Sequence, residues 1–78
     1  MYARTENPST GRRKIISQKI ADLWCAYLGY PVTAEDVSMM MALFKIARAS
    51  TGKYKADNYI DLAGYAACGM EIAEKNAE

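Results

Sequence analysis

Three stretches of this 78-residue chain repeat their apolar residues with the period of an α-helix. We predict helices over residues 12–28, 34–50 and 57–75. The first is amphipathic, with an apolar side formed by Ile16, Ile20, Leu23, Trp24 and Tyr27. Gly29 and Pro31 predict its end, because glycine suits the position after a helix and proline cannot continue one.

The second stretch is apolar around most of its circumference, through Val37, Met39, Met40, Met41, Leu43, Phe44, Ile46 and Ala47. This pattern predicts a buried central helix with neighbours on more than one side. A thin arc of small residues and one lysine remains, formed by Ser38, Ala42, Lys45 and Ala49. Small side chains there would allow the backbone of another helix to come close.

Thr33 and Asp36 predict the start of the second helix, as the N-cap residue and its N3 partner in a variant of the capping box. Asp36 projects along the apolar side, so it is either a capping residue or a ligand for a metal ion. In the third stretch, Asp57, Asp61, Gly64, Cys68 and Glu71 share one side. The small residues on this side, which stand beside carboxylates, indicate that a neighbouring group can approach the helix backbone closely.

Length and composition predict self-association. With 51% apolar residues and five methionines, the chain has more apolar surface than three short helices can cover. We therefore expect an all-α fold, a three-helix unit assembling into a helical-bundle homo-oligomer, most simply a symmetric dimer. Residues 12–78 are predicted to form one domain. Residues 1–11, which contain Pro8 and Gly11, are predicted to be a mobile or partner-ordered arm.

Several classes of protein are disfavoured. A net charge of +1 argues against duplex nucleic acid as a partner. Apolar runs fall short of the roughly 20 residues that span a membrane, and the N-terminal stretch lacks the apolar core of a signal peptide. Cys25 and Cys68 stand alone in helical patterns, as expected for reduced thiols in the cytoplasm. The sequence contains no histidine, which excludes nucleophiles activated by histidine.

Basic and aromatic residues suggest a binding site for a nucleotide, because such proteins stack bases on aromatic rings and contact phosphates through Lys and Arg. The candidate ligand-binding residues are Arg12, Arg13, Lys45, Arg48, Lys53, Tyr54, Lys55, Tyr59, Asp61 and Tyr65. Arg12 and Arg13 form either a phosphate clamp at a helix start or a solvated charge run. Tyr59 and Tyr65 are alternatively interface residues with hydrated hydroxyls.

Three acids are candidate metal ligands. Asp57 and Asp61 are four residues apart and so share one helix face, where two carboxylates suit a hard cation such as Mg²⁺. Asp36 would join them if the second and third helices begin close together. Alternatively, Asp57 or Asn58 caps the third helix, and the helix dipole favours Asp61 in its first turn.

The segments LWCAYLG, TAEDVSMMMALFKIAR and DNYIDLAGYAA resemble a family of short, uncharacterised bacteriophage and prophage proteins. The likeness covers nearly all of the chain from Ile20 onward and implies a location in the cytoplasm of an infected bacterium. The order of helices that carry acidic residues also resembles that of the all-α nucleotide pyrophosphatases of the MazG and dCTP-pyrophosphatase type. Those enzymes hold Mg²⁺ with four acids in ExxE and ExxD motifs, whereas Ser38 or Met39 stands here at the second acid position.

We therefore expect a non-catalytic phage protein that sequesters a nucleotide or nucleotide-derived signal and counters host defence, with no certain cofactor. One alternative is a Mg²⁺-dependent nucleoside triphosphate pyrophosphohydrolase of the MazG-like type. Another is a blocker of a host protein, which would use the Met-rich helix because methionine surfaces adapt to varied partners.

Overall fold

The computed structural model describes residues 8–77, with side chains from Arg12 onward, and consists of three helices. They are α1 (Pro8–Leu28), α2 (Ala34–Thr51) and α3 (Ala56–Ala77). The described part of the chain contains no strand, which confirms the all-α class. All three predicted helices are present, with ends that differ by a few residues from the prediction.

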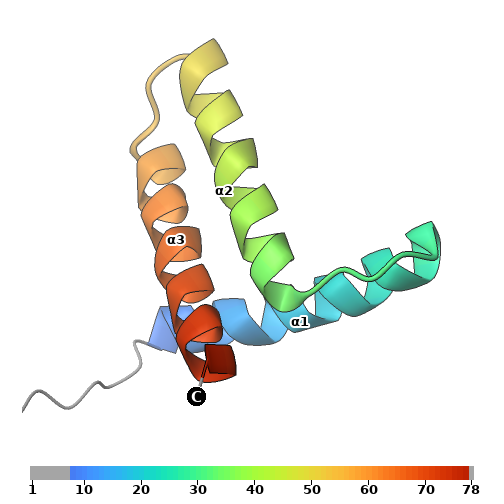
Figure 1. Ribbon diagram of the computed structural model, residues 1–78. Helices are drawn as coiled ribbons and strands as arrows, with labels where there is room; N and C mark the ends of the chain where they lie inside the picture. The colour runs from blue at the N-terminus through green and yellow to red at the C-terminus, as the bar shows by residue number, and fades with distance from the viewer. Residues whose placement is uncertain (1–7, 78) are drawn as a thin grey trace, which may run out of the picture.

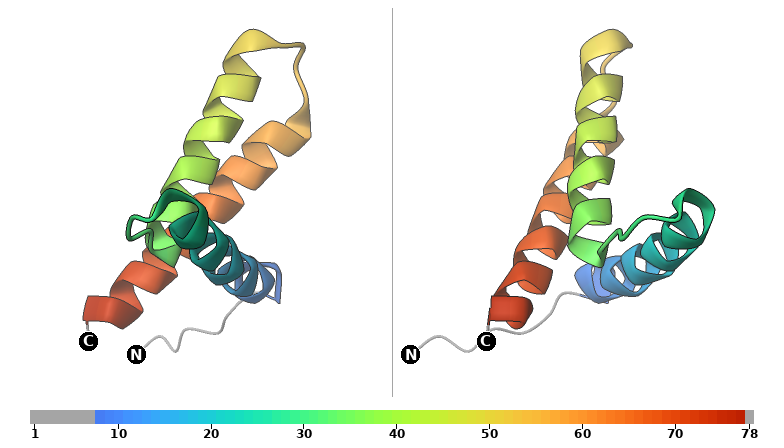
Figure 2. Two further views of the ribbon diagram at one scale, coloured as in Figure 1. Left: turned by 90° about the vertical axis from the view of Figure 1, so that its right-hand side faces the viewer. Right: turned by 45° about the vertical axis from the view of Figure 1, so that its right-hand side comes forward.

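Helices α2 and α3 form an antiparallel hairpin, and α1 crosses its base (Figure 1). The loop between α2 and α3 spans only residues 52–55, so the two helices must run in opposite directions. The second half of α1 projects beyond α2 on the side away from α3, as the further views in Figure 2 also show. The smallest extent of the molecule is 18 Å, less than two helix diameters of about 10–12 Å.

The first helix begins four residues before the predicted start at Arg12. Pro8 occupies its first position, where the fixed φ of proline suits a helix and its missing N–H is not needed. Residues 8–11 of the predicted arm are therefore part of α1. The remainder of that arm, residues 1–7, lies outside the described residues.

The capping box of α2 is confirmed. The Thr33 hydroxyl accepts a hydrogen bond from the Asp36 N–H at 3.0 Å, and the Thr33 N–H donates to the Asp36 carboxylate at 3.1 Å. Before it, Gly29 adopts a φ of +65°, the left-handed conformation that glycine reaches without a steric penalty. The Cys25 thiol then accepts a hydrogen bond from the Val32 N–H at 3.0 Å, which fastens the α1–α2 connection onto α1.

The core of the described chain is built from small side chains. Ser38 of α2 is fully buried, and its hydroxyl lies 3.4 Å from the Ser17 hydroxyl of α1 and donates to the Cys68 sulfur of α3, also at 3.4 Å. A Cβ added to Gly69 would already lie 3.4 Å from the Ser38 Cβ. The predicted arc of small residues on α2 therefore does allow a neighbouring backbone to come close, and that neighbour is α3.

The large apolar side chains lie on the opposite sides of the helices. Met39 and Leu43 of α2 are 54% and 62% exposed, and Tyr27 of α1 is 88% exposed. The prediction that α2 is a buried central helix is therefore wrong for the single chain. The reason is geometric: the small-residue sides allow closer packing of the three helices, which leaves the large apolar sides facing outward.

Candidate functional site

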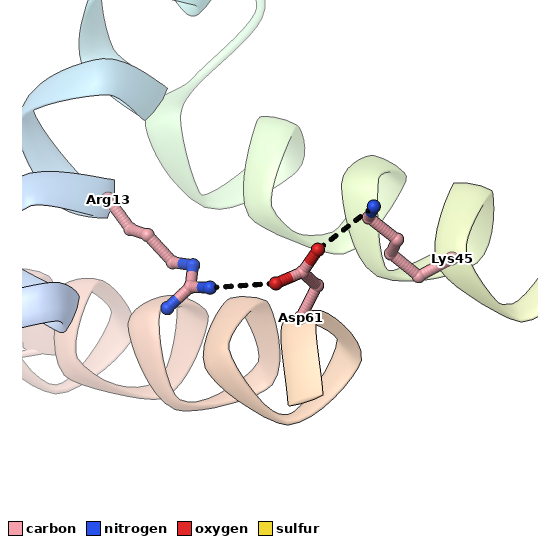
Figure 3. A network of polar contacts seen from close by, with 3 residues as sticks. All are labelled: Arg13, Lys45 and Asp61. Atoms are coloured by element: carbon pink, nitrogen blue, oxygen red, sulfur yellow. Dashed lines mark hydrogen bonds and ion pairs between the residues drawn. The ribbon is translucent and has the colours of Figure 1, made fainter. Parts of the chain in front are cut away.

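One carboxylate joins all three helices. Asp61 of α3 accepts a hydrogen bond from the Arg13 guanidinium of α1 at 3.2 Å through one oxygen, and its other oxygen lies 3.0 Å from the Lys45 ammonium of α2 (Figure 3). The three side chains are 17–31% exposed, so water screens them only in part. The Arg13 guanidinium also lies over the Tyr65 ring, 5.2 Å from its centre. We call Arg13, Lys45, Asp61 and Tyr65 the Asp61 cluster.

Gly64 makes room for this cluster. A Cβ added there would fall within 3.0 Å of all three terminal atoms of the Arg13 guanidinium. The side of α3 that the sequence marks as open to close approach is thus filled here by the long side chain of Arg13. Four of the predicted ligand-binding residues are brought together in this cluster, and their contacts are with one another.

The three predicted metal ligands are not brought together. Asp36 caps α2 at the base of the hairpin, whereas Asp57 lies in the first turn of α3 at the opposite end. The condition under which Asp36 would join them, that α2 and α3 begin close together, is not met, because the short loop forces an antiparallel pair. Among the described residues, no group of three His, Cys, Asp or Glu side chains is placed to hold a metal ion. Both oxygens of Asp61 already contact cations.

The structure also does not form the predicted phosphate clamp. Because α1 begins at Pro8, Arg12 and Arg13 lie beyond the first turn, where helix N–H groups are unpaired. Arg13 contacts Asp61, and the Lys14 ammonium lies 3.7 Å from the Glu71 carboxylate. Arg12 is exposed on α1.

A second group of predicted residues surrounds a hollow at the α2–α3 loop. The hollow has a volume of about 370 Å³ and is lined by Arg48, Thr51, Gly52, Lys53, Lys55 and Asn58. Three of these six carry a positive charge and none carries a negative one. We call this feature the loop hollow.

The two other candidate tyrosines are Tyr54, in the loop between α2 and α3, and Tyr59, near the start of α3. Tyr54 lies between the two lysines in sequence, and its ring centre is 6.0 Å from that of Tyr59 at the start of α3. Both tyrosines are exposed. Two exposed aromatic rings therefore belong to residues close in sequence to the lysines that line the loop hollow.

The sequence did not identify Thr51, Gly52 and Asn58 as lining residues. Asn58 is 4% exposed, and its N–H donates to the Lys55 carbonyl at 3.1 Å, which shapes the turn into α3. The sequence suggested Asn58 only as an alternative cap of the third helix. Its position three residues after Lys55 was the available signal.

The fold and the loop hollow define an all-α protein of three helices with a basic loop at one end of a helical hairpin. The chain belongs to the family described as a domain of unknown function, DUF6378, whose model matches residues 6–73. No solved structure matches it.

Two relatives are mycobacteriophage proteins. The chain is 47% identical over 57 residues to the Gene 55 protein of Mycobacterium phage L5, a match that covers 72% of the chain and 36% of the relative. It is 36% identical over 72 residues to the Gene 55 protein of Mycobacterium phage D29, covering 92% of the chain and 48% of the relative. The chain thus spans less than half the length of either relative. These matches confirm the expected family of uncharacterised phage proteins.

Within the described residues, no helix combines the length and apolar character required to cross a membrane.

Proposed function

We propose that this protein is a phage-encoded binding protein that holds the phosphate groups of a nucleotide in the loop hollow and does not hydrolyse it. The observation that carries the proposal is the gathering of Arg48, Lys53 and Lys55 around one hollow. A protein of this kind would lower the free concentration of a nucleotide signal in the infected cell and so counter host defence.

The electrostatics of the hollow favour an anion. Three cations line it without an acidic neighbour among the lining residues. It also lies where α3 begins, and the positive end of a helix dipole attracts phosphate. Its volume of about 370 Å³ falls at the small end of the range of about 300–1,000 Å³ that ligand pockets cover.

The neighbouring rings favour an aromatic ligand over inorganic phosphate. Tyr54 and Tyr59 are exposed, and Tyr54 stands between Lys53 and Lys55 in the sequence, which matches the combination of stacking and phosphate contact that binds nucleotides. A base would stack on the Tyr54 ring while its phosphate lies in the hollow.

The absence of hydrolysis is proposed from the acids. Asp61 is held between two cations, and Asp36 is a capping residue at the far end of the hairpin. The MazG-like alternative requires several carboxylates around one Mg²⁺, and the described acids of a single chain are not arranged in that way. We accordingly assign no catalytic residue and no cofactor.

Isothermal titration calorimetry tests the proposal. We would titrate the protein with linear and cyclic nucleotides and with inorganic phosphate, at low and high salt. Binding should weaken as salt rises, because the contacts are largely electrostatic. The double variant Lys53→Ala/Lys55→Ala should weaken binding at least about 10-fold, as expected for the loss of two charge-assisted contacts.

The matched control is Lys19→Ala, which removes an exposed lysine from α1, outside the loop hollow. It should leave the affinity unchanged. No heat with any of these ligands, or equal losses in the control and the double variant, would contradict the proposed site. Release of pyrophosphate from a nucleoside triphosphate in the presence of Mg²⁺ would instead establish the enzymatic alternative.

Self-association is the second part of the proposal. Exposed apolar side chains lie on the outer sides of all three helices, and single chains rarely leave so much apolar surface in water. We therefore propose that the functional form is a homo-oligomer.

A further inference from the structure

We infer that two copies of this chain form a dimer through the outer side of α2, with the two α2 helices antiparallel. This inference rests on the proposed self-association and names the surface responsible. It does not depend on nucleotide binding. The surface consists of Met39, Met40, Leu43, Phe44 and Ile46, and we call it the α2 strip.

The strip is a largely apolar surface, and the Lys45 ammonium and the Arg48 guanidinium each lie 5.7 Å from the centre of its Phe44 ring. Its five side chains are 45–62% exposed, and they lie across the helix from the buried Ser38 and Ala42. About two turns of α2 therefore present large apolar groups on the side opposite α3. Polar side chains, those of Asp36 and Ser50, are found on this side only near the two ends of the helix.

The described fold leaves this surface uncovered. The molecule is 18 Å thick, so its helices lie in no more than two layers. The second half of α1 projects past the strip and adds a second apolar arm, with Leu23, Tyr27 and Leu28 each more than half exposed (Figure 1).

Charge favours a second copy of the chain as the occupant. The first turn of α2 carries Glu35 and Asp36, and its last turn carries Arg48. In an antiparallel pair the acidic start of each helix lies toward the basic end of the other, and the helix dipoles are also opposed favourably. The surface is therefore self-complementary, as an interface with two-fold symmetry requires. A parallel pair would bring like charges together.

A standard interface buries about 800 Å² on each partner around a central apolar cluster. Five large side chains of the α2 strip, with the arm of α1 beside them, provide such a cluster. Packing two hairpins through this side of α2 would place the four helices in the order α3, α2, α2 of the second copy and α3 of the second copy.

Sedimentation equilibrium of the variant Leu43→Glu tests the interface. Leu43 is 62% exposed in the single chain, so the substitution should not disturb the fold, and circular dichroism would verify its helix content. A charge at the centre of an apolar interface should raise the dimer dissociation constant at least about 100-fold. The matched control is Ile60→Glu on the outer side of α3, where the exposure is 61%.

The expected result is a wild-type oligomer that becomes a monomer with Leu43→Glu, whereas Ile60→Glu remains at least a dimer. A monomeric wild type at high micromolar concentration would overturn both the inference and the proposed self-association. An oligomer unaffected by Leu43→Glu, or dissociated equally by both substitutions, would overturn the α2 interface alone. Nucleotide titration of the same samples reports separately on the loop hollow.

Discussion

The Arg13 guanidinium and the Asp61 carboxylate lie 3.2 Å apart, although 48 positions separate them in the chain. This contact links the first helix to the last, and Lys45 on the other carboxylate oxygen links both to α2. Asp61 therefore joins the three helices through two ion pairs. Their shared core contains few large side chains, so these ion pairs add to a small apolar contribution.

Replacing Asp61 with Asn should destabilise the fold. The substitution removes the negative charge between Arg13 and Lys45, both largely shielded from water, and leaves two cations close together. We expect a loss of about 1–2 kcal/mol in the free energy of unfolding, above the value for a fully exposed pair. Urea titration at fixed protein concentration measures it. Asp22→Asn, which alters an exposed carboxylate on α1, is the control and should change stability by less than about 0.5 kcal/mol.

Gly64→Ala should be unfavourable, in contrast to most exchanges of glycine for alanine within a helix, which gain about 1 kcal/mol. The added Cβ would occupy the position of the Arg13 guanidinium and displace it from Asp61 and Tyr65. In an Arg13→Ala background the same substitution should recover the helix-propensity gain. A double-mutant cycle on unfolding free energies measures the difference. A stabilising effect in the wild-type background would contradict this role of Gly64.

Thr33→Ala should remove the hydroxyl half of the capping box and destabilise the protein by about 1 kcal/mol. Asp36→Ala should have a similar effect on thermal or urea unfolding, because its carboxylate accepts the Thr33 N–H. Neither substitution should alter nucleotide affinity, since both residues lie at the opposite end of α2 from the loop hollow. Loss of Mg²⁺ or nucleotide binding in folded Asp36→Ala protein would reassign this residue from capping to ligand binding.

Tyr54→Ala should separate base recognition from phosphate recognition. Loss of one stacking ring weakens base binding by about 1 kcal/mol, or roughly 5-fold, whereas affinity for inorganic phosphate should persist. Calorimetry with a nucleotide and with phosphate compares the two. Tyr54→Phe is the conservative control and should retain nucleotide affinity, because stacking uses the ring and not the hydroxyl. Equal losses for both ligands with Tyr54→Ala would show that the ring supports the loop instead of a base.

Local sequence signals predicted the helices well. The Thr33–Asp36 cap and the Gly29 turn depend on atoms within a few residues of each other, so their chemistry can be read without the fold. The pattern of small residues on α2 and α3 also indicated which sides could approach closely, and Ser38 and Gly69 confirm it. The start of α1 was missed because Gly11 obscured the favourable position of Pro8.

The amino-acid sequence by itself determined the all-α class, the existence of three helices and the capping of α2, since these follow from periodicity and contacts between near neighbours. Only the tertiary structure decided that Asp61 would meet Arg13 and Lys45 instead of Asp36, and that the α2 strip would face outward. Both outcomes depend on how the hairpin folds back on itself and where α1 crosses it. A helical period shows that two sides differ, and packing selects the side that is buried.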